Sequence, residues 1–196
     1  MPLILASQSH ARQTMLKNAG IDFKSLPADL DEEKIIQDLE KEHASVGKIA
    51  LSLAEEKALV ISKEHAQDYI IGSDQVLSMN DKIYSKAKNK QEAIQRLIEF
   101  QGQEHFLTSA VCVAKGGEVL WHKTDVAALT MKPLSTQDID KYSEIAGDAL
   151  TSCVGCYAIE GAGIRLFHDI RGDYFTIMGM PLLPLLNYLD GVEALS

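Results

Sequence analysis

Hydrophobic and polar positions are grouped along the chain into segments, and the period within each segment predicts a helix or a strand. A short apolar run at residues 3–6 predicts the first strand, and a helical pattern follows it directly, with Ser9 as a suitable N-cap. Residues 44–65 carry apolar side chains at helical spacing and predict a long helix. Residues 69–79 are largely apolar, which predicts a buried strand that breaks at Gly72.

The middle of the chain predicts an amphipathic helix followed by a hairpin. Residues 88–102 have the apolar spacing of a helix. Two β-rich runs follow at 105–114 and 119–131, and the Gly116-Gly117 pair between them is a hairpin signal. The sequence therefore predicts a β-hairpin that follows an N-terminal region with the element order of a βαβ unit.

The last third of the chain combines both kinds of pattern. Ser135 and Asp138 have the spacing of a capping box and predict the start of a helix. Residues 157–181 are β-like with glycines at the turns, and residues 181–189 predict a final helix. Strands and helices mix throughout, which predicts α/β lobes around a cleft and not a simple doubly wound sheet. The 196 residues suffice for a single domain of two such lobes.

Composition and charge narrow the functional classes. The net charge of -9 argues against a nucleic acid polymer as partner, although a small anionic ligand needs only a few local cations. No apolar run reaches the length of a membrane span, and the first apolar residues are too few for a signal sequence, so we expect a cytoplasmic protein without a membrane partner.

Cys153 and Cys156 have the spacing of a redox pair. Two small buried thiols are the favoured interpretation, and no second pair completes a zinc site.

The turn between the first strand and the first helix contains Ser7, Ser9 and Arg12. A helix N-terminus carries partial positive charge, which disfavours a cation such as Arg12 unless an anion lies between the two. Two interpretations follow. Either the Arg12 side chain points into water, or it binds an anion such as a phosphate together with the helix end.

Acidic and basic residues further along the chain are also candidates. Residues 28–34 form an acidic loop, in which Glu32 and its neighbours are either solvated or bind Mg²⁺. Asp74 comes directly after an apolar strand segment and can bind a metal or act as a general base, unless loop amides satisfy it. Lys57 and Lys86 are ordinary surface lysines when each is considered alone. Together with the arginine of the first turn they can form the cationic side of a phosphate site.

Acids for a metal, cations for phosphate and a helix N-terminus are the components of metal-assisted phosphoanhydride hydrolysis. The common nucleotide motifs G-x-x-x-x-G-K and G-x-G-x-x-G do not occur. In chain order, however, the candidate segments resemble the Maf family of nucleotide pyrophosphatases. The stretches that carry the resemblance are LILASQSHARQTML, ADLDEE, LAEEKA, IIGSDQV, YSKAK, CVGCYAIEGAGIRLF and GDYFTIMGMPL.

The resemblance implies a fold, a reaction and an assembly. The fold is a two-lobed α/β structure of the Maf/ITPase type, with an elongated mixed sheet, flanking helices and the active site in the cleft. The reaction is hydrolysis of a nucleoside triphosphate, a small-molecule substrate, to the monophosphate and pyrophosphate, with Mg²⁺ or Mn²⁺ as cofactor. The assembly is a homodimer.

The resemblance also assigns roles to the residues that match the motifs of the family. The phosphate-binding residues are Ser7, Ser9 and Arg12. The catalytic residues are Asp74 as proton acceptor, Lys57 and Lys86. The metal ligands are Glu32 and Asp74. For Asp74 the chemistry agrees, because a carboxylate can orient and deprotonate a water while cations stabilise the developing charge.

The chain departs from the family pattern at two places. The usual start is Ser-x-Ser-Pro-Arg-Arg, whereas His10 and Ala11 replace the proline and the first arginine here, so one cation is lost. The usual Lys-Pro is Lys86-Ala87 in this chain, which loosens the turn around the lysine.

Three positions are diagnostic for the base in this family, and they are Ala11, Gln75 and Glu160 here. Gln75 and Glu160 match the branch that acts on 7-methyl-GTP, and Ala11 matches neither branch. A carboxylate such as Glu160 can accept from the two adjacent donors of a guanine edge, whereas a uracil or thymine edge presents two carbonyls. The resemblance therefore favours 7-methyl-GTP, with dTTP or UTP as the alternative. A non-catalytic nucleotide-binding regulator of cell division is the alternative of another class.

Overall fold

The chain divides into two compact units in the computed structural model, which describes residues 3–192 and 194. Unit 1 takes its residues from Met1–Gln75, Thr108–Asp125 and Gly179–Ser196. Unit 2 takes its residues from Val76–Leu107 and Val126–Met178. Two compact units are consistent with the two expected lobes, and a cleft shared by them stays a prediction.

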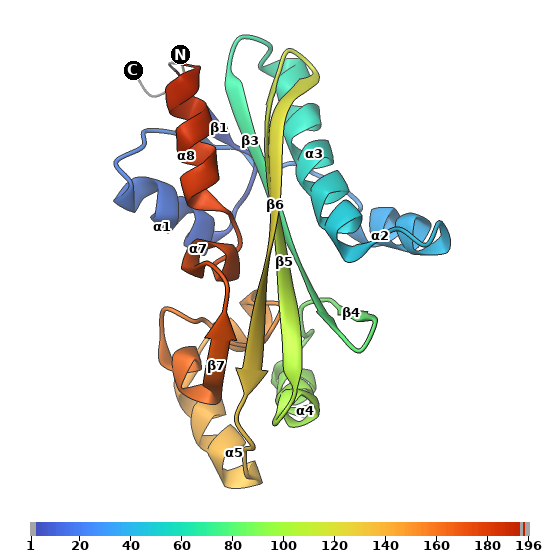
Figure 1. The fold of residues 1–196 in the computed structure, drawn as a ribbon, viewed down its shortest axis with the longest axis vertical. Coiled ribbons are helices and arrows are strands. Elements are labelled where there is room, and N and C mark those ends of the chain that lie inside the picture. The colour runs from blue at the N-terminus through green and yellow to red at the C-terminus, as the bar shows by residue number, and fades with distance from the viewer. Residues whose placement is uncertain (1–2, 193, 195–196) are drawn as a thin grey trace. The chain divides into compact units, whose positions relative to one another are not determined.

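The strands form a mixed seven-stranded sheet in the order β2-β1-β3-β5-β6-β7, with β4 paired to β3 (Figure 1). The strands are β1 (Leu3–Leu5), β2 (Lys24–Ser25), β3 (Tyr69–Met79), β4 (Lys82–Tyr84), β5 (Glu104–Lys115), β6 (Glu118–Met131) and β7 (Phe167–Arg171). The pairs of β1 with β2 and β3 are parallel, whereas β3 with β4 and β6 with β7 are antiparallel. The sheet and its helices confirm the mixed α/β fold class.

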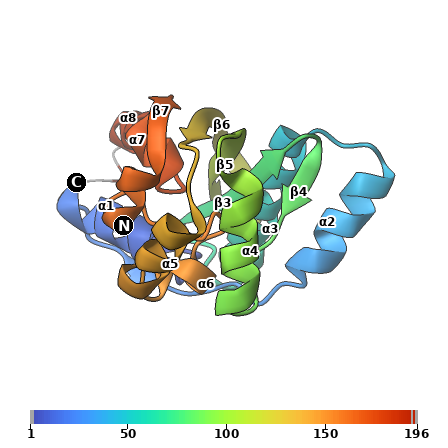
Figure 2. The ribbon, with the colours of Figure 1, turned by 90° about the horizontal axis from the view of Figure 1, so that it is seen from below.

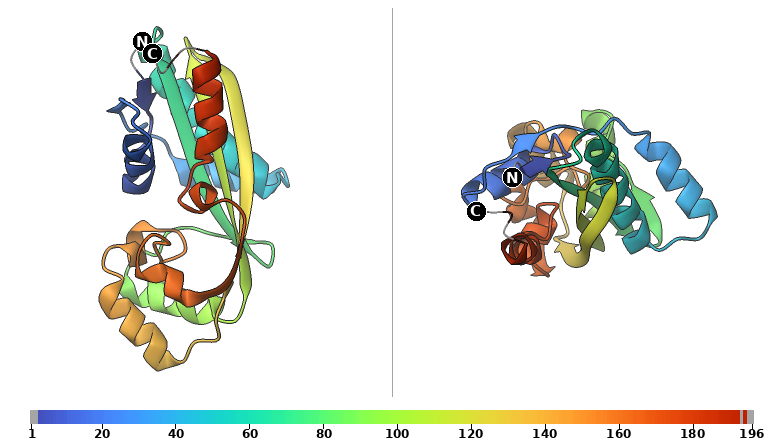
Figure 3. Two further views of the ribbon diagram at one scale, coloured as in Figure 1. Left: turned by 60° about the vertical axis from the view of Figure 1, so that its left-hand side comes forward. Right: turned by 90° about the horizontal axis from the view of Figure 1, so that it is seen from above.

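The helices that the structure describes in unit 1 are α1 (His10–Asn18), α2 (Glu32–Lys41), α3 (Val46–Glu64) and α8 (Leu182–Gly191). Helices α3 and α8 lie on opposite faces of the strands of this unit (Figures 1 and 3). A Cβ at Gly72 of β3 would lie 2.0 Å from the carbonyl oxygen of Ala54 in α3. Only glycine therefore lets α3 approach β3 this closely. No described helix is long and apolar enough to cross a membrane.

Unit 2 holds the remaining helices, which are α4 (Lys90–Phe100), α5 (Thr136–Ile145), α6 (Ala149–Ser152), α7 (Tyr174–Ile177) and the 3₁₀ helix η1 (Ala162–Leu166). Helix α4 packs against α5 and α6, as Figure 2 shows. The core of this unit includes Phe100, Leu129, Tyr157 and Phe167, which are buried. His105 is also buried there, stacked on Phe100 and hydrogen-bonded through Nε2 to the Tyr157 hydroxyl at 2.6 Å.

Several predicted elements are confirmed, because their signals act within a few residues. The long helix at 44–65, the hairpin turn at Gly116 and Gly117 with φ of +60° and +84°, and the capping box at Ser135 are all present. The first strand, the helix at 88–102 and the final helix are present as well.

Three predicted features are wrong. Residues 28–34 are not a continuous acidic loop, because Asp31 caps α2 and Glu32 begins it. Strand β3 does not break at Gly72 but continues through it. The missing side chain of Gly72 lets α3 pack closely against β3. Residues 157–181 are mostly not β, but contain η1, the short β7 and α7. Apolar residues in this segment are buried without strand pairing, and burial alone gives the same hydrophobic pattern as a strand.

Candidate active site

The turn from β1 into α1 builds the first part of the site. Ser9 is the N-cap of α1, and its hydroxyl accepts from the backbone N–H of Arg12 at 3.4 Å. The hydroxyl oxygen of Ser7 accepts from the Ser9 backbone N–H at 3.2 Å and from Nη1 of Arg12 at 3.3 Å. The turn therefore places two hydroxyls and the free amides of a helix N-terminus beside one guanidinium, which is a suitable arrangement for an anion.

The Arg12 side chain does not point into water, because the residue is only 8% exposed. Its Nε donates to the carbonyl oxygen of Gly179 at 2.9 Å, across 167 residues of sequence. Burial lowers the pKa of Arg12, while the charges of Asp74 and Glu32 act in the opposite direction. Of the two interpretations left open by the sequence, solvent exposure is wrong, and the arginine is held inside unit 1.

Gly179 is a site residue that sequence reasoning missed. Its carbonyl oxygen also lies 2.9 Å from the hydroxyl of Ser73 on β3, so one carbonyl links β3 to Arg12 on α1. Gly179 has a φ of +105°, and a Cβ there would lie 3.4 Å from Nη2 of Arg12. The local sequence signal for Gly179 is a glycine before Met-Pro. This signal does not indicate that the Gly179 carbonyl accepts from Arg12 in the first helix.

Lys57, Asp74 and Glu32 form the second part of the site. The Lys57 Nζ lies 2.5 Å from Oδ1 of Asp74 and 2.9 Å from Oε1 of Glu32. Lys57 and Asp74 are buried, whereas Glu32 is exposed at the start of α2. Gly72 and Asp74 share one face of β3, since they are two residues apart. The close approach of α3 at Gly72 therefore brings Lys57 to Asp74.

The two carboxylates fit the donor set that the sequence predicted for a divalent metal. Asp74 and Glu32 converge on one ammonium group, so their oxygens lie close together. Mg²⁺ commonly binds one or two carboxylates and takes its remaining ligands from water and substrate phosphates. Within residues 3–192 and 194, no group of three or more His, Cys, Asp and Glu side chains gathers as a metal site.

The predicted residues divide between the two units. Unit 1 contains Ser7, Ser9, Ala11, Arg12, Glu32, Lys57, Asp74 and Gln75. Gln75 donates from Nε2 to the Ser109 hydroxyl at 3.0 Å. Unit 2 contains Lys86 and Glu160, both exposed, and both charges act on Cys153 between them in sequence.

The cysteines show no sign of redox chemistry. Burial raises the pKa of the Cys153 thiol and raises that of Cys156 to about 11. A reactive thiol needs a lowered pKa. Cys153 and Cys156 are both free thiols. The interpretation as a small buried side chain is confirmed for Cys156, whereas Cys153 is only half-buried.

The fold and this site define an α/β protein with a buried charged site at the carboxyl end of a parallel strand pair, where such folds bind anions. The chain belongs to the Maf family, because residues 2–192 match the family described as Maf-like protein. The resemblance inferred from the motifs is thereby confirmed.

Curated relatives match along the full chain. A nucleoside triphosphate pyrophosphatase of Granulibacter bethesdensis is 45% identical over 100% of both chains. A 7-methyl-GTP pyrophosphatase of Brucella suis is 44% identical over 95% of this chain and 94% of its own. Among solved structures, the Ham1 protein of Staphylococcus aureus is similar over 67% of this chain and 71% of its own, with 14% identity and a TM-score of 0.41.

Proposed function

We propose that this protein is a nucleoside triphosphate pyrophosphatase that hydrolyses the bond between the α- and β-phosphates. The observation that carries the proposal is the buried contact of Lys57 with Asp74, in the same unit as the buried Arg12. A carboxylate that can take a proton and cations that can bind phosphate are the groups this reaction needs. The name of the Granulibacter relative supports the same reaction.

In this proposal the triphosphate binds at the turn that precedes α1. The Ser7 hydroxyl accepts two hydrogen bonds from this turn, and its own proton can be donated to a phosphate oxygen. The guanidinium of Arg12 uses two of its five N–H groups on Gly179 and Ser7 within the described part of the chain. The remaining donors and the α1 N-terminus provide positive charge for the triphosphate.

Hydrolysis then uses Asp74 as the proton acceptor. Asp74 orients a water and takes its proton as the water oxygen attacks the α-phosphorus. The bond from the α-phosphorus to the bridging oxygen breaks, and pyrophosphate leaves with that oxygen. Lys57 holds the carboxylate of Asp74 in place. Lys86 supplies positive charge that stabilises the negative charge developing on the leaving pyrophosphate.

A divalent cation completes the proposal. Glu32 and Asp74 would hold Mg²⁺ or Mn²⁺, and the bound ion would neutralise charge on the phosphates. Both carboxylates contact Lys57 in this structure, so the residues that would bind the ion already lie together.

The proposed substrate is 7-methyl-GTP. Gln75 and Glu160 are the residues that support it, and the printed name of the Brucella relative agrees. Glu160 is exposed in the turn before Gly161, so its carboxylate is accessible to a ligand. The proposal includes a homodimer, which the family resemblance implies, in the cytoplasm. Light scattering of the purified protein tests the dimer.

A substrate panel tests the reaction and the base together. Pyrophosphate release is measured with 7-methyl-GTP, GTP, dTTP, UTP and CTP, each with Mg²⁺, with Mn²⁺ or with a chelator. We expect 7-methyl-GTP to have the highest kcat/KM and the chelator to abolish the reaction. Equal or better turnover of UTP or dTTP would assign the pyrimidine branch instead. Binding of nucleotides without any hydrolysis would favour the regulator.

Two variants connect the panel to the residues. Asp74→Asn should lower kcat by about 100- to 10,000-fold, the usual contribution of a general base, whereas Asp68→Asn, in the same unit, should not. Glu160→Gln should shift preference from 7-methyl-GTP towards pyrimidine nucleotides, and Glu144→Gln on α5 is its exposed control. An unchanged substrate profile in Glu160→Gln would exclude a base-reading role for Glu160.

A further inference from the structure

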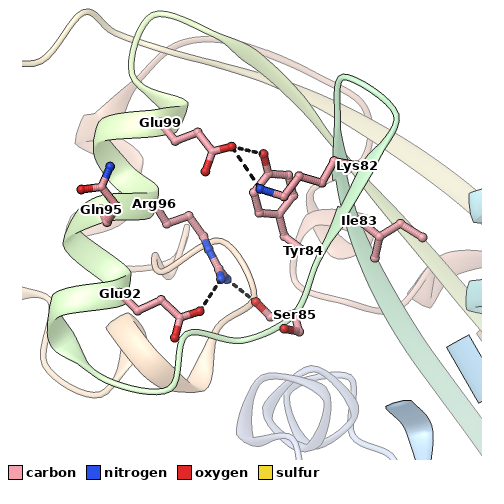
Figure 4. A pocket seen from close by; sticks show the side chains of 8 residues that line it. All are labelled: Lys82, Ile83, Tyr84, Ser85, Glu92, Gln95, Arg96 and Glu99. Atoms are coloured by element: carbon pink, nitrogen blue, oxygen red, sulfur yellow. Dashed lines mark hydrogen bonds and ion pairs between the residues drawn. The ribbon is translucent and has the colours of Figure 1, made fainter. Parts of the chain in front are cut away.

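A pocket of about 320 Å³ in unit 2 lies between β4 and α4 (Figure 4). Its lining side chains include two cations, Lys82 and Arg96, and two carboxylates, Glu92 and Glu99. Lys82 and the Tyr84 hydroxyl both contact Glu99, and Arg96 contacts Glu92. The charges of this pocket are therefore balanced within it, which does not favour an anion or a cation as ligand.

Arg96 is the buried one of the four charged residues in this pocket, at 8% exposed, and it reaches backbone atoms. Its Nη1 donates to the carbonyl oxygen of Ser85 and, at 3.1 Å, to that of Val154. Its Nη2 lies 3.0 Å from Oε1 of Glu92, one turn earlier on α4. The guanidinium thus ties α4 to the segment that precedes it in the chain, at Ser85, and to a distant segment, at Val154.

Glu92 extends these contacts to the other side of Lys86. Its second oxygen, Oε2, accepts from the backbone N–H of Lys88 at 3.0 Å. The Glu92 backbone N–H donates to Asn89, the N-cap of α4, at 2.9 Å. The carbonyl one residue before Lys86 and the amide two residues after it are therefore both held by one ion pair.

We propose that Arg96 and Glu92 are positioning residues, which fix the backbone on both sides of Lys86 and so set the place of its ammonium group. This inference rests on the proposed function, because the role of Lys86 in the reaction comes from there. Lys86 is exposed, so its side chain does not fix this segment, and the buried Ala87 packs in the core of unit 2 through a single methyl group. The backbone on both sides of Lys86 is held in addition by the hydrogen bonds of Arg96 and Glu92. The contact of Arg96 with Val154 extends the effect to the turn before Glu160.

The decisive variant is Arg96→Met, with Lys82→Met as its matched control. Both changes remove one cation from the same pocket, but Lys82 contacts the Glu99 side chain and no atom of residues 85–88 among the described residues. We expect Arg96→Met to lower kcat/KM by about 100-fold, the size of effect that small misplacements of catalytic groups have. Lys82→Met should change it by no more than about 2-fold, as expected for an exposed ion pair.

A second substitution separates positioning from general loss of stability. Proline fixes its own φ and restricts the residue before it, so Ala87→Pro restricts this segment without Arg96. The Ala87 amide makes no hydrogen bond with the described residues that a proline would remove. We expect Ala87→Pro to recover about 10-fold of the loss in the Arg96→Met background, because it reduces the freedom of the loosened chain.

Hydrogen exchange provides a readout that does not depend on activity. Amides of residues 85–88 should exchange faster in Arg96→Met than in Lys82→Met, with β6 unchanged in both. Equal exchange in the two variants would overturn the proposal, and so would faster exchange without any loss of kcat/KM. If the wild-type protein hydrolyses no nucleotide, the proposed function fails, while the exchange data still decide whether Arg96 holds this segment.

Discussion

Two arginines, one in each unit, are buried to the same extent and differ in their charged partners. Arg12 on α1 and Arg96 on α4 are each 8% exposed. Each donates to a backbone carbonyl that is far away in sequence, at Gly179 for Arg12 and at Val154 for Arg96. Burial and hydrogen bonding to carbonyls therefore do not distinguish the functions of these two residues.

The partners of opposite charge do distinguish them. Arg96 has a direct ion pair with Glu92, whereas the direct partners of Arg12 among the described residues are a carbonyl and the Ser7 hydroxyl. A buried charge with only neutral direct partners is costly unless a ligand compensates it. Arg12, which has no contacting carboxylate among the described residues, is therefore suited to an anion, whereas Arg96, paired with Glu92, is suited to holding the chain.

The largest effect is expected from Arg12→Met, which removes the guanidinium from the proposed phosphate site. We expect kcat/KM for the best nucleotide to fall by about 100- to 1,000-fold, as for other donors aimed at developing negative charge. Arg12→Lys should recover only part of the loss, because an ammonium cannot bind Gly179 and a phosphate in the same fork geometry. A wild-type KM and kcat in Arg12→Met would remove the difference between the two arginines.

Lowering the pH should act on unit 2 through His105. Burial lowers the pKa of His105 to about 4, well below the value of about 6.5 for an unperturbed imidazole. As the pH falls, His105 takes up a proton in the unfolded state at a higher pH than in the folded state. The contribution to the free energy of unfolding is therefore complete above about pH 6.5 and falls towards pH 4, by about 3 kcal/mol in total. Urea unfolding followed by circular dichroism at several pH values measures this slope.

The control for this pH dependence is His105→Phe, which keeps an aromatic ring beside Phe100 and removes the titration. Its stability between pH 6.5 and 4 should depend less on pH than that of the wild type. Fluorescence of Trp121, which stacks on Tyr188 in unit 1, reports on the other unit in the same samples. An unchanged slope in His105→Phe would mean that other groups cause the loss at low pH.

The smallest effect in this series is expected from Gly179→Ala. A non-glycine residue at a φ of +105° should lower the free energy of unfolding by about 1–3 kcal/mol. Gly20→Ala, at a φ of +74° with no atom within 4 Å of a built Cβ, is the matched control for strain alone. Only Gly179→Ala should also raise the KM for nucleotide, because its Cβ would contact Nη2 of Arg12 at 3.4 Å and limit where the guanidinium can lie. Equal kinetics in both variants would show that Gly179 does not orient the arginine.

The arrangement of the predicted site residues depends on contacts that no local sequence signal indicated. Lys57 and Asp74 were singled out separately, one on a helix and one after an apolar run, and nothing local indicated that they touch. The contact depends on Gly72, which looked like a strand break in the sequence. Glycine is compatible with a bend and with a close approach of a helix, and only the position of α3 distinguishes the two.

For the acidic segment at residues 28–34, the sequence also left two structures possible, a loop and the start of a helix. Three consecutive carboxylates predicted a loop, whereas Asp31 caps α2, Glu32 contacts Lys57 and Glu33 is exposed. Acidic residues are favourable in the first turn of a helix, so the sequence was also compatible with a helix start. Residues 157–181 have a strand-like pattern because many of their apolar side chains pack in the core of unit 2, although strand pairing is limited to the short β7.

Elements with strong local signals, and the chemical groups available to the protein, could be predicted from the amino-acid sequence. Helical periodicity, a Gly-Gly turn and a capping box act over a few residues, and the motif order placed the chain in its family. Tertiary structure alone decided where Arg12 points, that Gly179 holds it and that Arg96 holds the segment around Lys86. The physical reason is range, because a buried charge takes its partners from wherever packing brings a carbonyl or carboxylate, and those partners here lie up to 167 residues away.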